Sequence, residues 1–137
     1  MAVTHVPYFH GLPTILVTFV ARKPSTRIVR RLLVDSGFTG KSALALSAGD
    51  CQNFRRRFAR ASEVGGALRG MHQRVWVKCS LPELGFADSL LALSADLAPF
   101  SLPNGIDGLV GLSFLTRFAR WGGEQNAVGE WSFFLET

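Results

Sequence analysis

The sequence predicts one domain of mainly β structure. Its 137 residues match the length of a single ordinary domain. Hydrophobic residues make up 47% and charged residues 18%, which excludes a disordered chain and allows a sizeable core. Runs of β-branched and apolar residues recur along the chain, without an internal repeat. We therefore expect a single domain over residues 1–137, with its core between 12 and 136.

A hairpin opens the predicted domain. Thr14–Val20 is β-branched and apolar, as in a buried strand, and residues 22–25 have the composition of a turn. A second strand is expected over Arg27–Val34. It ends abruptly at residues 35–40, which contain two glycines and a carboxylate, and a further short strand is expected within 42–46.

The segment 47–61 is expected to form a helix. Ser47 or Ser42 can cap its start, and Phe54 and Phe58 lie four residues apart, on one helical face. The rest of this helix carries a cluster of four arginines: Arg55, Arg56, Arg57 and Arg60.

Two strands flanked by loops follow. Residues 65–70 are glycine-rich and predict a flexible tip, after which 74–79 alternate as in a half-exposed strand. Another strand is expected over Phe86–Ser94, and residues 99–105 are expected to form a loop.

The last part combines a short helix with a strand. Residues 113–121 resemble a short amphipathic helix that the pair Gly122-Gly123 ends. A final strand is expected over 131–135, which makes the whole chain mainly β with one or two helices. Three tryptophans are expected in the core or at an interface: Trp76, Trp121 and Trp131.

Composition also limits the environment and the partners. No apolar stretch reaches the roughly 20 residues that cross a bilayer, and the N-terminus lacks a secretory signal, so we expect a cytoplasmic chain without a membrane partner. Cys51 and Cys79 lack metal-site spacing and are expected to be free thiols. The net charge of +5 raises the expectation of a polyanionic partner only modestly.

The most informative segment is Leu33-Val34-Asp35-Ser36-Gly37. A carboxylate directly after a buried strand is costly unless N–H groups and a hydroxyl of the same loop solvate it. Ser36 supplies a hydroxyl, and Gly37 permits a sharp turn that directs amides at the carboxylate. Taken alone, this tripeptide is more simply interpreted as an Asx turn that ends a strand.

A second segment lies some seventy residues further on. Leu109 and Val110 form an apolar pair between Gly108 and Gly111, directly before the expected short helix. By itself, this pattern is equally compatible with a core strand that leads into a helix.

Together, Val34-Asp35-Ser36-Gly37 and Leu109-Val110-Gly111 resemble the motifs of the retropepsin-like aspartic proteases, which are single-domain relatives of pepsin. The resemblance extends in element order from about Thr14 to Leu135. It implies a closed β-barrel of the retropepsin (acid protease) type with one or two short helices. It also implies that the terminal strands often pair across a dimer, which would place 131–135 at the interface.

The resemblance implies an aspartic endopeptidase that acts as a homodimer on protein or peptide substrates. Asp35 of each subunit would activate one water, because two close carboxylates share a proton. No metal or cofactor is implied. Ser36 would cross-link the two catalytic loops, with support from Gly37, Phe38 and Thr39. The flap over the substrate would be the hairpin tip that contains Gly65, Gly66, Leu68 and Gly70.

Three features depart from the family pattern. Phe38 stands where retroviral members have a small residue, and Leu112-Ser113 replace an arginine followed by Asn or Asp. The hairpin tip carries Glu63, Leu68 and Arg69 instead of small apolar residues only. The alternative hypothesis is therefore a catalytically inactive binding or assembly module on the same fold.

Three other functions are less favoured. Gly40-Lys41-Ser42 matches the end of a P-loop, but Asp35 occupies the position of its first glycine. A hydrolase triad built on Ser36 or Ser113 lacks the nucleophile-elbow pattern. The histidines His5, His10 and His72 are too scattered in the sequence to suggest a set of metal ligands. Nucleic-acid binding by the four arginines is less favoured than a solvated helix face.

Overall fold

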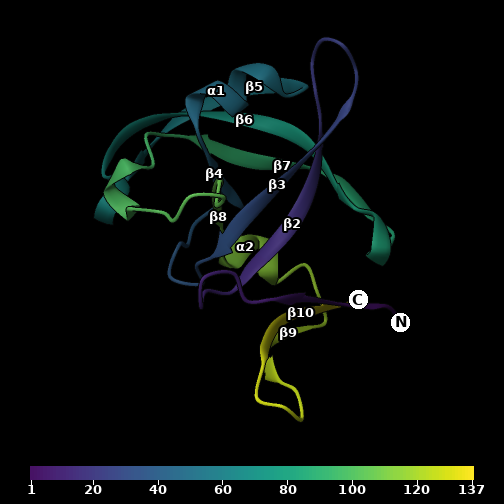
Figure 1. The fold of residues 1–137 in the computed structure, drawn as a ribbon. Coiled ribbons are helices and arrows are strands. Elements are labelled where there is room, and N and C mark those ends of the chain that lie inside the picture. Colours follow the sequence, from purple (N-terminus) through teal and green to yellow (C-terminus); the bar gives the residue numbers. More distant parts are fainter.

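The computed structural model describes residues 1–137, apart from the side chain of Ala67. Its centre is a closed barrel of six strands with mixed directions (Figure 1). The strands occur around the barrel in the order β2 (Thr14–Val20), β3 (Arg27–Val34), β8 (Gly108–Val110), β4 (Leu44–Leu46), β7 (Phe86–Ser94) and β6 (Gly70–Leu81). The mainly β, closed-barrel prediction is confirmed at this level.

Barrel closure depends on a short pairing between β2 and β6. Thr18 lies opposite Ser80 and Phe19 opposite Cys79, in antiparallel register. β3 pairs with β8 in parallel, β4 pairs with β7 in parallel, and the remaining barrel pairs are antiparallel. β8 thus lies between β3 and β4, which are consecutive in the chain. The loop that joins these two strands must pass the end of β8.

β5 (Arg56–Val64) lies outside the barrel and extends β6 into a long hairpin. The register shifts between Ala59 and Ser62, and Arg74 Nε donates to the carbonyl of Arg60 at 2.6 Å within this irregularity. A bulge bends the strand that contains it and increases its twist. The hairpin ends in a 3₁₀ turn, η1 (Gly66–Leu68).

The two ends of the chain meet in a separate three-stranded sheet. β10 (Trp131–Glu136) lies between β1 (Val3–Pro7) and β9 (Arg120–Gln125), with both pairings antiparallel. Figure 1 shows this sheet at the end of the molecule away from β5 and β6. The final strand is confirmed, but both its edges pair within its own chain, so β10 has no free edge for pairing across a dimer.

Alternation within the strands builds the core. Ile15, Val17 and Phe19 point into the barrel and are at most 1% exposed. The Phe19 ring stacks on Phe54, with centroids 4.5 Å apart and planes 5° from parallel. Thr14–Val20, Arg27–Val34 and Phe86–Ser94 are strands with the predicted bounds. The first two are rich in β-branched residues, whereas the third is held by its apolar run 90–93, which is buried in the barrel.

The predicted helix over 47–61 is largely wrong. α1 spans only Ala48–Asn53, and Ser47 caps it as predicted, since its Oγ accepts from Asp50 N at 3.2 Å. Phe54 has extended backbone angles, and β5 follows. Phe58 is 65% exposed and contributes nothing to the core. Pairing with β6 outweighs the helical preference of the segment, and the arginine cluster therefore lies mainly on a strand.

The second predicted helix is also shorter than expected. α2 spans only Leu112–Leu115, and Trp121 lies in β9 opposite Leu135. Gly122 and Gly123 continue this strand instead of ending a helix. A side chain at Gly123 would collide with the Tyr8 hydroxyl, so the glycine permits close packing between the terminal segments.

Two further elements of the sequence analysis can be placed. Cys51 and Cys79 are buried free thiols, as predicted, and burial raises the pKa of the Cys79 thiol to about 12. Among the described residues, the helices are all too short to span a membrane.

Candidate functional site

The fold brings the two sequence motifs into contact. Asp35 directly follows β3, where Val34 lies opposite Val110 of β8 in parallel register. The Asp35 amide continues this ladder and donates to the Val110 carbonyl at 2.9 Å. Segments some seventy residues apart in the chain therefore meet at the end of one parallel strand pair.

A compact turn holds the Asp35 carboxyl group. Gly37 N donates to Asp35 Oδ1 at 3.1 Å, and Phe38 N donates to the Asp35 carbonyl at 3.0 Å. Asp35 is partly exposed, and Ser36 and Gly37 are exposed. The carboxyl group is therefore fixed by its own loop and accessible to a second molecule.

This local bond alone does not identify a site, because a second aspartate makes the same one. Asp96 Oδ1 accepts from the amide two residues further on, Ala98 N, at 3.0 Å. The Asp35 turn differs in what lies behind it. Leu112 N, at the start of α2, donates to the Phe38 carbonyl at 2.9 Å and thereby ties the turn to the second motif.

Phe38 and Gly111 form the closest contact between the motifs. A Cβ atom at Gly111 would lie 2.5 Å from the Phe38 carbonyl oxygen and 2.6 Å from its ring. Leu109 and Val110 are fully buried. The large residue at position 38 is thus accommodated because residue 111 is glycine, and both belong to one packed unit.

The β5–β6 hairpin reaches this unit with its tip. Leu68 of η1 is only 5% exposed and belongs to a core cluster with Leu109. Phe38 and Val64 pack against the same cluster. The His72 ring bonds to the Leu68 carbonyl and holds the tip from the β6 side. Leu68, which departs from a small-residue tip, therefore anchors the predicted flap segment.

A pocket of about 230 Å³ separates the Asp35 loop from the hairpin. Residues 38–42 line one side, and Ser62–Gly65 with Arg74 line the other. Asp35 is not part of its lining. The pocket includes Phe38, Thr39 and Gly65 from the sequence prediction. It adds Ser62 and Arg74, which no local sequence pattern indicated, and Lys41, which the sequence indicated only as part of a P-loop match.

The second motif contains one unsatisfied polar atom. Ser113 Oγ, in the first turn of α2, is buried and has no hydrogen-bond partner among the described residues. An unpaired buried hydroxyl typically costs about 1–3 kcal/mol. The departure Leu112-Ser113 therefore weakens this part of the chain in the single subunit.

The geometry weakens the rival hypotheses. Ser42 leads into β4, not into the helix that a P-loop requires. No hydrogen bond joins a serine to a histidine among the described residues, and His5 lies 3.6 Å from Glu124. Nor do three or more His, Cys, Asp or Glu side chains cluster there in a way that could hold a metal ion.

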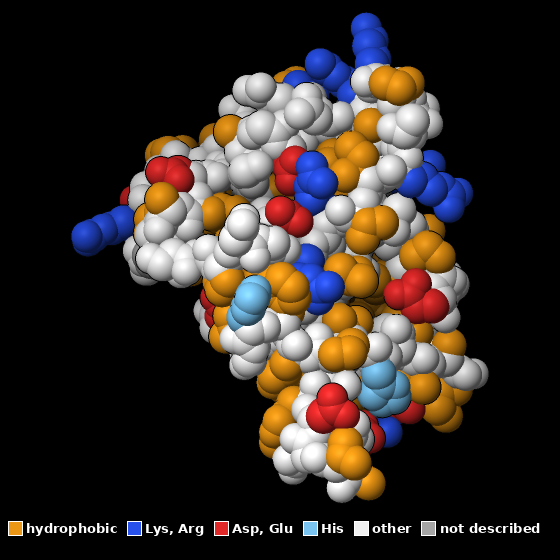
Figure 2. All heavy atoms as spheres, in the orientation of Figure 1, with side chains coloured by type: hydrophobic (Ala, Val, Ile, Leu, Met, Phe, Trp, Pro, Cys, Tyr) orange, Lys and Arg blue, Asp and Glu red, His pale blue; other side chains and the backbone are white. Residues whose placement is uncertain are grey.

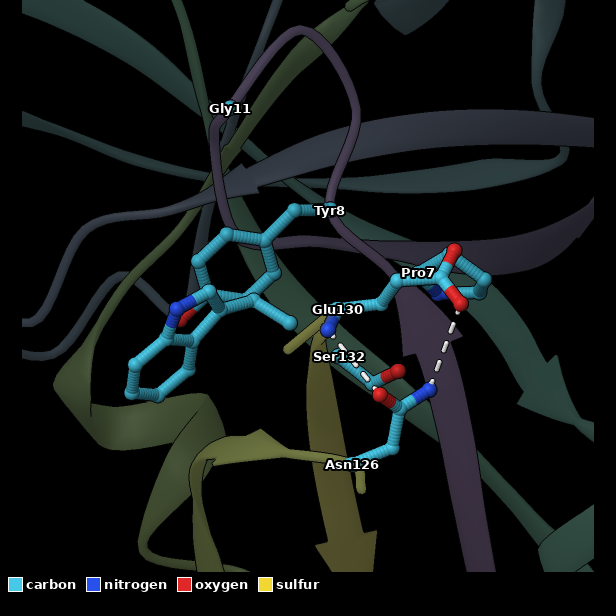
Figure 3. A pocket seen from close by; sticks show the side chains of 7 residues that line it. Pro7, Tyr8, Gly11, Asn126, Glu130 and Ser132 are labelled. Atoms are coloured by element: carbon cyan, nitrogen blue, oxygen red, sulfur yellow. Dashed lines mark hydrogen bonds between the residues drawn. The ribbon is translucent and has the colours of Figure 1, made fainter. Parts of the chain in front are cut away.

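A wider pocket of about 740 Å³ lies at the terminal sheet (Figure 3). Tyr8 and Trp131 stack along it with ring centroids 6.0 Å apart, and Trp131 is 47% exposed. Asn126 and Glu130, which are hydrogen-bonded to each other, line it as well. None of the motif residues lines this pocket, so it is a separate surface feature.

No protein-family model matches the chain, and neither a curated protein nor a solved structure is found to be similar to it.

Proposed function

We propose that this chain is an aspartic endopeptidase of the retropepsin type that acts as a homodimer. The carrying observation is the packed unit formed by the Asp35 turn and the Leu109-Val110-Gly111 segment, joined by the bonds from Asp35 N to Val110 O and from Leu112 N to Phe38 O. The two motifs that carry the sequence resemblance are thus neighbours in space, on a closed barrel.

The exposure of the turn supports a site completed by a second subunit. Asp35 is partly exposed, and Ser36 beside it is exposed. Each subunit supplies one Asp35, and the twofold axis brings the two carboxyl groups together. Ser36 of each loop is then available to bond the opposite loop.

The proposed chemistry needs one proton between two carboxyl groups. Two carboxylates at hydrogen-bond distance cannot both ionise readily, so the pair holds a single proton. The ionised carboxylate takes a proton from a water molecule as the water attacks the peptide carbonyl carbon. The protonated carboxyl hydrogen-bonds to the developing oxyanion, and a proton is then delivered to the leaving amine.

The hairpin supplies the substrate cover in this proposal. Its tip packs beside the Asp35 turn through Leu68, and the pocket between loop 38–42 and Ser62–Gly65 provides room for a substrate side chain. The tip opens to admit a peptide between it and the Asp35 turn. Leu68, Val64 and the bond from the His72 ring to the Leu68 carbonyl hold the tip, so its opening breaks few contacts and costs far less than unfolding the barrel.

The test compares two aspartates that make the same local bond. Asp35→Asn is expected to lower peptide cleavage by about 10²–10⁴-fold or more, whereas Asp96→Asn keeps the wild-type rate. Thermal unfolding should remain comparable in both variants, since each asparagine retains an oxygen acceptor for the turn. Light scattering in a dilution series should show a species with twice the chain mass of 15.0 kDa.

Two results would reject the enzyme. One is a folded Asp35→Asn variant that cleaves as fast as the wild type. The other is a monomer at every concentration in the presence of substrate, because one Asp35 cannot form the pair. The monomer result would favour the binding module on the same fold.

A further inference from the structure

The outward face of the β5–β6 hairpin carries cations around one tryptophan. Val75 and Val77 point into the core, so the alternate residues Trp76 and Lys78 point outward. Arg57 lies directly opposite Trp76 in the β5–β6 register. Lys78 N donates to the Arg55 carbonyl at 3.5 Å, which makes Arg55 and Lys78 cross-strand neighbours.

These residues surround a shallow pocket of about 190 Å³. Its lining contains four cations, one aromatic ring and one hydroxyl: Arg55, Arg56, Arg57, Lys78, Trp76 and Ser89. None of them has a carboxylate. The Arg57 guanidinium lies 5.7 Å from the centre of the Trp76 ring, so cation and ring form one surface.

The positive charge on this face is not neutralised by ion pairs. The ion pairs among the described residues involve other basic groups, such as Arg30 with Asp50 and Arg117 with Asp88. Like charges held side by side, as at Lys78 and at Arg55 just before β5, repel each other. An anionic ligand with several charges relieves this repulsion.

We propose that this face binds single-stranded nucleic acid. Arg55, Arg57 and Lys78 contact successive phosphates, and an unpaired base stacks on the surface formed by Trp76 and Arg57. A run of acidic residues matches the cations equally well but offers no flat ring that can stack on Trp76. In a duplex the bases are stacked on each other inside the helix, so none is free to stack on Trp76.

The strand structure of this segment removes the reason for treating the arginines only as a solvated helix face. On a helix, they would lie on the solvent side, opposite phenylalanines in the core. On β5 they alternate instead, and β6 adds Lys78 and Trp76 next to them. In Figure 2, Lys and Arg side chains project from the upper end of the molecule, where Figure 1 places the β2–β3 turn.

The test measures the affinity of the whole chain for a fluorescent oligouridylate over a salt series. Arg57→Gln/Lys78→Gln is compared with Lys41→Gln/Arg69→Gln, which removes the same charge from exposed residues outside the patch. The patch variant should reduce the slope of log K against log salt by about 1.4, at roughly 0.7 per phosphate contact. The control variant should keep the wild-type slope.

Trp76→Leu separates stacking from charge. It should weaken binding about tenfold at fixed salt without a change in slope, because it removes a ring and no cation. Asp35→Asn should bind as the wild type does, which distinguishes this proposal from the protease. Equal losses in the patch and control variants, or no binding at low salt, would overturn the proposal. Equal affinity for an oligoglutamate of the same length would assign the face to acidic peptides instead.

Discussion

Replacing Gly111 with alanine should destabilise the chain strongly. Gly111 has φ −103° and ψ −176°, extended angles that any residue adopts, so the cost is a steric one. The added Cβ would lie 2.5 Å from the Phe38 carbonyl oxygen, and restoring ordinary contact requires a shift of about 0.9 Å. That oxygen already accepts from Leu112 N at 2.9 Å, so the shift also weakens this bond.

Both contributions can be given a magnitude. Overpacking typically costs about 1–3 kcal/mol, and one weakened hydrogen bond adds about 1 kcal/mol. We therefore expect the free energy of unfolding to fall by about 2–4 kcal/mol and Tm to fall by about 10 °C. Urea unfolding followed by tryptophan fluorescence measures the first quantity, and calorimetry measures the second.

Gly49→Ala provides the matched control. Gly49 lies in α1, and its added Cβ would approach only Ser47 Oγ, at 4.0 Å. Alanine in a helix is favoured over glycine by about 0.5–1 kcal/mol, so this variant should be unchanged or slightly more stable. If Gly111→Ala matched Gly49→Ala in stability, the close packing of the two motifs would be refuted.

Four further predictions concern the tip, the orphan hydroxyl, a buried thiol and the terminal sheet. Leu68→Ala should speed amide exchange at the hairpin tip by about 30-fold, while β2 amides stay unchanged; equal acceleration in both would deny local opening. Ser113→Ala should raise the free energy of unfolding by about 1 kcal/mol in urea unfolding, and a lower free energy would indicate that the hydroxyl has a hydrogen-bond partner in solution. Burial raises the pKa of Cys79 from 9.0 to about 12, so the thiol ionises in the unfolded chain first and the free energy of unfolding falls as pH rises from 9 to 12. Over this pH range Cys79→Ala should lose less unfolding free energy than Cys51→Ala, as measured by urea unfolding at each pH. Trp131→Glu should raise the Kd of the proposed dimer by about 30-fold in light scattering; an unchanged Kd would show that the terminal sheet is not the dimer contact.

Strands whose local pattern and tertiary environment agree could be predicted from the sequence. Thr14–Val20 and Arg27–Val34 have the predicted bounds, because alternating apolar residues point into a barrel that needs them. The Asp35 turn was also predictable, since the strand must end where a carboxylate and two glycines follow. The contact between this turn and Gly111 was not among the predictions, because the two segments lie some seventy residues apart and no local pattern indicates their packing.

Segments whose structure depends on distant pairing could not be predicted. The four-residue spacing of Phe54 and Phe58 is typical of a helix, yet Phe54 stacks on Phe19 while Phe58 is 65% exposed on a strand. β6 supplies the partner for this strand, and nothing within 47–61 indicates that partner. The cationic face was missed for the same reason, because Trp76 and Lys78 join the arginines only across strands.

The terminal sheet restricts how the proposed dimer can form. β10 is paired on both edges within its own chain, which leaves the outer edges of β1 and β9 and the exposed side chains. Exposed apolar residues on this sheet and its turn include Val3, Val128 and Trp131. The segment between β1 and β2 connects the sheet to the motif, since Val34 N donates to Pro13 O at 2.9 Å beside Asp35.

We expect a twofold contact that brings two Asp35 turns together to include exposed apolar side chains of the terminal sheet, such as Trp131. The β5–β6 face lies at the other end of the molecule (Figure 1). Trp131→Glu should then weaken dimerisation and cleavage together, and oligouridylate binding should persist in the monomer. Loss of oligouridylate binding together with dimerisation and cleavage in Trp131→Glu would contradict this arrangement, because the two proposed surfaces lie at opposite ends of the molecule.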